Sequence, residues 1–182
     1  RSAAQLLALG DLFPAAAGAL LWAVAPVLCS EVEPSVPELR PGRSLEAEPE
    51  KLLEQVCVLV ASPVTAPGRP PCIDAETLAS LRKVFEALAA YLPRLQSLDE
   101  HPRLKGVPFV PCLLDESSDL AAALFVPQRA AFRAQHDHRA LSPALGIVKP
   151  GDPTVRIVAD AANVPREPRA DVLAELLRGQ GG

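Results

Sequence analysis

The strongest constraint on the fold lies at residues 104–111, where the apolar, β-rich octet LKGVPFVP carries two prolines. A proline lacks the N–H donor that a β-ladder needs, so it is confined to edge strands, strand starts and bulges. Pro108 and Pro111 therefore predict a short strand that is paired on one side. A second apolar run at residues 124–127 is its expected partner, with a polar turn between the two.

The segment before this strand pair has the periodicity of an amphipathic helix. Asp74 is a natural N-cap, and Pro93 ends the pattern. Between them, apolar residues recur at steps of three and four and form one stripe that is expected to be buried. The stripe consists of Leu78, Leu81, Phe85, Leu88 and Leu92.

Five further helices are expected. A short one covers Ser2 to Leu9 and ends at Gly10. One runs from Pro14 to about Val24, and one covers residues 49–61, although the β-branched end at 57–60 leaves a strand open as an alternative. Residues 152–163 and 168–179 read as two helices that would form an αα-hairpin at the end of the chain.

These elements define an α+β fold that is mainly helical, with a short, proline-interrupted strand pair packed on helices. Residues 1–48 are expected to form an N-terminal helical segment and a proline-rich loop, and residues 49–182 a mixed α+β module that ends in the αα-hairpin. The chain has 20 prolines and 4% aromatic residues, which favours short elements with many connections. It has no methionine, so a fragment or a processed chain is expected.

Charge and cysteine usage limit the classes of partner. The net charge is −4, residues 1–50 are predominantly acidic, and no basic run is present. Nucleic-acid affinity depends on clustered Lys and Arg, so no nucleic-acid partner is expected. Cys29, Cys57, Cys72 and Cys112 lack the spacing of a zinc site. They are expected to be reduced thiols, which favours the cytoplasm.

Residues 12–29 form an almost uncharged run whose length is at the lower limit for crossing a bilayer. Pro14 and Pro26 flank it, and a buried core helix is the preferred interpretation. A membrane-anchored fragment is kept as an alternative.

Two local clusters could carry metal chemistry. His136 and His138 could share one face of a strand, with His101 as the remaining histidine, but a solvated loop is expected because Arg133 and Arg139 would repel a cation. Residues 115–119 place three carboxylates together without the glycine turn of a calcium loop. No metal and no cofactor are therefore expected.

Catalytic motifs are absent from the sequence, so no catalytic residue is assigned and the chain is expected not to be an enzyme. A dispersed active site, with Cys112 or a serine as nucleophile and His136 or His138 as base, is kept as an alternative for a small hydrolase or transferase. Lys149 precedes the helix start at Asp152 and is the best available phosphate ligand, but the Asp152 carboxylate would occupy the phosphate position.

From Leu78 onward the chain resembles the repeating segments of sacsin and its relatives, which are large proteins built around Hsp90-like ATPase modules. The resemblance rests on the order of LAAYL at 88–92, LKGVPFVP at 104–111, LFVPQ at 124–128 and ADVLAELL at 170–177. The ATP-binding motifs of that family do not occur here. The resemblance implies a non-catalytic, chaperone-related segment that contacts other modules of the same parent chain and protein partners.

Overall fold

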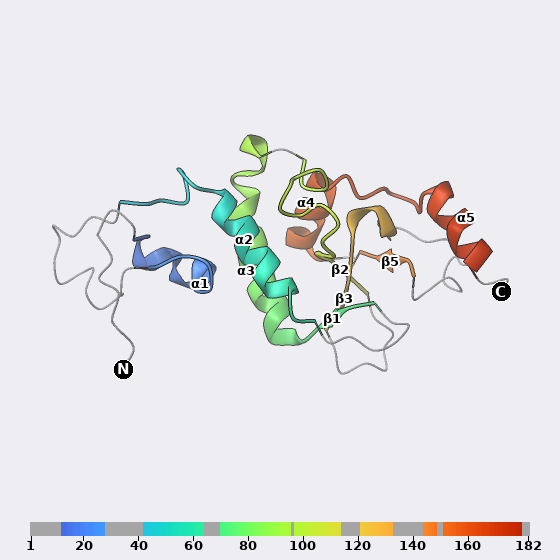
Figure 1. The fold of residues 1–182 in the computed structure, drawn as a ribbon, viewed down its shortest axis with the longest axis horizontal. Helices are drawn as coiled ribbons and strands as arrows, with labels where there is room; N and C mark the ends of the chain where they lie inside the picture. Colours follow the sequence, from blue (N-terminus) through green and yellow to red (C-terminus); the bar gives the residue numbers. More distant parts are fainter. Residues whose placement is uncertain are drawn as a thin grey trace.

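A computed structural model describes residues 12–27, 42–63, 70–95, 97–113, 121–132, 144–148 and 151–179. Figure 1 shows an elongated arrangement in which helices α2 and α3 lie at the centre. The short α1 lies on one side of them, and the small sheets and α4 lie on the other. One continuous set of buried side chains runs from Phe13 to Val164. The predicted α+β, mainly helical fold class is confirmed.

Helix α2, Glu50–Val60, begins directly after Pro49. Its buried positions recur at helical spacing and face α1 and α3. The four residues at 57–60 are helical, so the strand alternative for this segment is wrong. Burial against two neighbouring helices outweighs the modest preference of β-branched residues for strands.

Helix α3, Ala75–Ala89, has the predicted N-cap: the Asp74 carboxylate accepts a hydrogen bond of 2.7 Å from the Thr77 amide. Four of the five expected stripe residues are buried, and Val84 is buried with them. Leu92 differs, because it falls in the following 3-10 turn η4, Leu92–Arg94, and is half-buried.

The main sheet has three antiparallel strands in the order β1-β3-β2: β1, Cys72–Ile73; β2, Val110–Cys112; and β3, Ala122–Phe125. The predicted strand pair is β2 with β3, in register Val110 to Phe125. The first half of the octet is not a strand. Gly106, at φ +76°, lies in a turn in which the Val107 amide bonds to the Leu104 carbonyl.

Pro111 lies inside β2 without costing a ladder bond. The amide of Leu113 points away from β3 and donates to the Ile147 carbonyl at 2.8 Å. Residues two apart in a strand present their amides on the same side, so the Pro111 nitrogen also faces away from β3. This explains why the β2–β3 pairing tolerates a proline, as the edge-strand argument required.

A second, two-stranded sheet joins the first. The 3-10 turn η5, Pro127–Arg129, leads into β4, Ala130–Ala131, which pairs in parallel with β5, Gly146–Ile147. Val148 also forms an antiparallel bridge to Cys112. Residues 147 and 148 therefore connect the outer edge of β2 to β4.

The N-terminal described segment is less helical than expected. It contains the 3-10 turn η2, Ala15–Ala17, and the four-residue helix α1, Gly18–Leu21, and it does not continue to Val24. Phe13, Ala17 and Leu21 are buried in the common core. Packing against that core therefore positions this segment, although its helices are short. Among the described residues, no helix is long and apolar enough to span a bilayer.

Helix α4, Pro153–Ala161, starts and stops as predicted: Asp152 is its N-cap, and Asn163 follows it with φ +53°. It packs on α3 and β2. Helix α5, Ala170–Gly179, lies apart from α4 in Figure 1. The expected αα-hairpin is therefore not formed, because the buried face of α4 is already covered by α3. The division at residues 48 and 49 stays a prediction.

Candidate functional site

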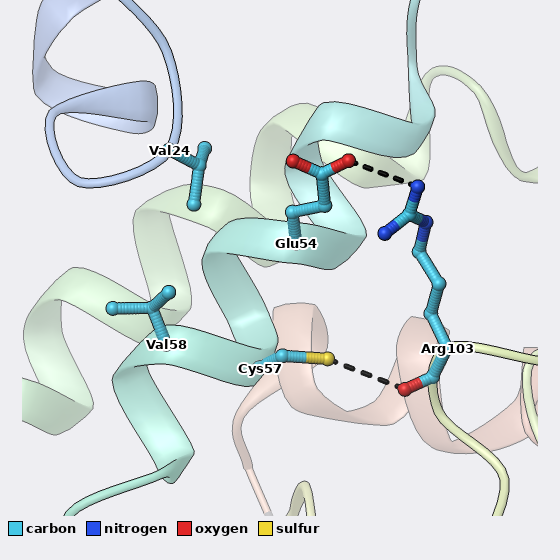
Figure 2. A pocket seen from close by; sticks show the side chains of 5 residues that line it. All are labelled: Val24, Glu54, Cys57, Val58 and Arg103. Atoms are coloured by element: carbon cyan, nitrogen blue, oxygen red, sulfur yellow. Dashed lines mark hydrogen bonds and ion pairs between the residues drawn. The ribbon is translucent and has the colours of Figure 1, made fainter.

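A hollow of about 450 Å³ lies beside α2 and is lined by Val24, Glu54, Cys57, Val58 and Arg103. Figure 2 shows Val24 and Val58 on one side of it and Arg103 on the other, with Glu54 turned toward Arg103. The hollow thus combines an apolar wall with a charged one.

Three separate parts of the chain build this hollow. Glu54, Cys57 and Val58 are three and four residues apart on α2, so they share one face of the helix. Val24 comes from the turn after α1, where the neighbouring Ala23 amide donates to the Gln55 side-chain oxygen at 3.3 Å. Gln55 is fully buried, and its Nε2 has no partner within the described structure.

The charged wall is an ion-pair network. Arg103 Nη2 lies 3.0 Å from Glu54 Oε1, and Lys51 Nζ lies 2.7 Å from Glu54 Oε2. Arg103 Nε is also 3.9 Å from Glu50. The Glu54 carboxylate, whose side chain is 20% exposed, is therefore engaged at both oxygens, which fixes the position of Arg103 at the mouth of the hollow.

Cys57 is half-buried at the edge of this network, and its Sγ donates to the Arg103 carbonyl oxygen at 3.3 Å (Figure 2). Burial raises the pKa of the thiol, the charge of Arg103 opposes that shift, and the charge of Glu54 adds to it. The thiolate is the reactive form of cysteine. Cys57 is therefore held as a neutral, hydrogen-bonded thiol, which is suited to packing against a ligand.

A second hollow, of about 560 Å³, adjoins the first because Glu54 and Arg103 line both. We call the two together the α2 groove. Its second half is strongly charged, with a lining that includes Arg43, Glu48, Glu50, Lys51 and Arg94. The groove therefore passes from an apolar end near Val58 to a charged end near Lys51.

The structure gives Cys112 a core position. It is 0% exposed, its Sγ donates to the Val110 carbonyl at 3.6 Å, and burial raises the pKa of its thiol far above the usual range. A substrate could not reach it, so the proposed role of Cys112 as a nucleophile is wrong. No disulfide joins Cys57, Cys72 and Cys112, and Cys29 lies outside the described residues.

Most of the other candidate sites fall outside the described part of the chain. These are His136 and His138, the acidic cluster at 115–119, and Lys149. His101 is described: it is buried, and its Nδ1 accepts from the Arg103 amide at 3.3 Å. It therefore supports the turn that carries Arg103.

The N-terminus of α4 is occupied by its own cap. Asp152 Oδ1 accepts from the Val155 amide at 3.1 Å, and Arg82 Nε donates to Asp152 Oδ2 at 2.6 Å. A carboxylate thus holds the position at which a phosphate would bind, as the sequence argument anticipated.

Within the described ranges, no cluster of His, Cys, Asp and Glu side chains could hold a metal ion. Comparison with known proteins adds no assignment: no family model, no curated protein and no solved structure matches this chain.

Sequence reasoning missed the α2 groove. Its lining residues come from positions 24, 43–58, 94–95 and 103, and no local pattern joins them. The one signal in the sequence was that apolar residues outnumber charged residues at 55–60. The buried stripe of α2 does not include all of them, and Val58 is left exposed.

Proposed function

We propose that this chain is a non-catalytic segment that acts through protein contacts, and that the α2 groove is its contact surface. The observation that carries the proposal is solvent exposure of large apolar side chains at the apolar end of the groove. Val58 is 42% exposed on the groove wall, and Trp22, two residues before Val24, is 63% exposed.

Exposed aromatic and aliphatic side chains beside a hollow are the features that anchor protein interfaces. Trp and Arg are enriched among the residues that contribute most binding energy, and Trp22 and Arg103 lie on the segments that form this hollow. Isolated exposed apolar residues are ordinary on any surface. It is the combination of Val24 and Val58 on one wall of the hollow, with Trp22 exposed in the same turn as Val24, that supports a contact surface.

The sacsin-like relationship is part of the same proposal. It is supported by the order of sequence phrases at 88–92, 104–111, 124–128 and 170–177. A parent chain that also carries an Hsp90-like ATPase module is the expected finding, and a short parent without one would overturn the relationship. The thiols Cys57, Cys72 and Cys112 support a reducing, cytoplasmic location.

Site-specific photo-crosslinking tests the contact surface. A photoreactive phenylalanine analogue replaces Val58 in one variant and Ile157 in another, both in the full parent chain. Ile157 is a matched control because it is 45% exposed and lies on α4, away from the groove. We expect discrete crosslinked species from position 58 and none from position 157.

Equal crosslinking from the two positions, or none from either, would contradict the proposal. A circular dichroism spectrum of each variant verifies that α2 and α4 remain folded.

A further inference from the structure

We propose that the α2 groove binds an extended acidic peptide segment, with an apolar side chain of the peptide at the Val58 end and its carboxylates at the Arg94 end. This inference rests on the proposed function and adds the chemistry of the partner. It is carried by the distribution of paired and unpaired charge along the groove.

The acidic side chains of the groove are already engaged. Glu48 pairs with Arg43 at 3.1 Å, Glu54 pairs with Lys51 and Arg103, and Glu50 lies 3.9 Å from Arg103. Their charges are therefore largely neutralised within the protein. A cationic ligand would have to displace one of these partners.

Among the basic side chains that line the groove, Arg94 differs from those that take part in the ion-pair network. It is exposed at the end of η4, lines the charged half of the groove, and has no ion pair within the described ranges. An unpaired guanidinium beside a neutralised network leaves an excess of positive charge in the groove. Guanidinium groups bind carboxylates in a planar, bidentate geometry, so a carboxylate is the chemical group that fits.

The other end requires an apolar group. Val24 and Val58 form one wall, and the neutral Cys57 thiol adjoins them. A charged side chain placed there would lose its hydration without a partner, whereas a leucine or phenylalanine would remove both valines from water.

The length of the groove matches a short extended segment. Lys51 and Val58 are seven residues apart on α2, a rise of about 10 Å at ~1.5 Å per residue. An extended peptide covers that distance in about three residues. One carboxylate and one apolar side chain separated by two or three positions would therefore span the α2 wall from Val58 to the charged half of the groove, which Arg94 also lines.

The probe is a fluorescein-labelled, end-blocked peptide in which glutamates precede leucines, titrated with the full chain and followed by fluorescence anisotropy. We expect saturable binding that weakens as salt screens the charge contact. A peptide with lysines in place of the glutamates, and one with serines in place of the leucines, should bind far more weakly.

Two groove variants and one control variant assign the binding to the groove. Arg94→Glu should weaken the acidic peptide about tenfold and strengthen the lysine peptide. Arg166→Glu makes the same charge change at an exposed arginine outside the groove lining and should leave binding unchanged. Val58→Ser should weaken both peptides that carry leucines.

Equal effects of Arg94→Glu and Arg166→Glu, or no binding of the acidic peptide, would overturn this inference. If position 58 still gives crosslinked species, the proposed contact surface is retained and only the acidic nature of the partner is rejected. If position 58 gives no crosslinked species, the proposed function itself is refuted.

Discussion

Replacing Asp152 by alanine removes two interactions at the start of α4. One is the N-cap bond to the Val155 amide at 3.1 Å, and the other is the ion pair with Arg82 at 2.6 Å. An N-cap contributes about 1 kcal/mol. The Arg82 side chain is 40% exposed, so water screens the pair and its contribution is about 0.5 kcal/mol.

The expected loss in the free energy of unfolding is therefore about 1.5 kcal/mol. For a chain of this length it corresponds to a decrease in melting temperature of about 3–6 °C. Urea unfolding followed by far-ultraviolet circular dichroism measures the free energy directly.

Two further variants separate the contributions. Asp152→Asn keeps a good capping side chain and removes the charge, so it should lose only the ion-pair part, and Arg82→Ala should match it. If Asp152→Asn is as destabilising as Asp152→Ala while Arg82→Ala has no effect, the division between cap and ion pair is wrong. If Asp152→Ala is indistinguishable from the parent chain, the N-cap assignment fails as well.

Three other predictions address the core, acid stability and the thiols. Phe85→Ala should cost about 3–5 kcal/mol in urea unfolding because the ring is buried, and an unchanged midpoint would refute the buried stripe. The bond from the Thr77 amide holds the pKa of Asp74 below its usual range, so its stabilisation is present above the unfolded pKa and is lost as pH falls through the folded value. Unfolding midpoints measured from neutral to acid pH should fall less for Asp74→Asn, and an identical decrease would contradict this. Iodoacetamide with peptide mapping should modify Cys57 slowly and Cys112 only after unfolding; modification of Cys112 first would contradict its buried position.

The helices were largely predictable because their signals are local. The Asp74 cap and the stripe on α3 lie within one segment, as do the Asp152 cap and the Asn163 stop of α4. The helix predicted at 14–24 was wrong because the structure of this segment depends on non-local contacts. Its composition fits a helix, but burial of Phe13 against distant residues determines its shape.

The strands and the groove depend on contacts between distant residues. Strand β1 has two residues and exists because Cys72 pairs with Ala123, so no local pattern could reveal it. Pro108 and Pro111 predicted an edge strand, and β2 is the edge of the three-stranded sheet, but the prolines could not show that Gly106 turns the chain before it. The groove depends on the ion pair between Arg103 and Glu54, which are 49 positions apart in the sequence. No local pattern around either residue predicts this contact.

The junction between the two sheets also limits association between molecules. Because the Leu113 amide donates to Ile147, the outer side of β2 is covered at its end and offers no free run of donors and acceptors to a neighbouring chain. Within the described residues, the outermost strands of the joined sheets are β1 and β4, each of two residues. Strands this short are poor templates for intermolecular β-pairing. Detachment of residues 146–148 would uncover the outer side of β2, whose free donors and acceptors could then pair with a neighbouring chain.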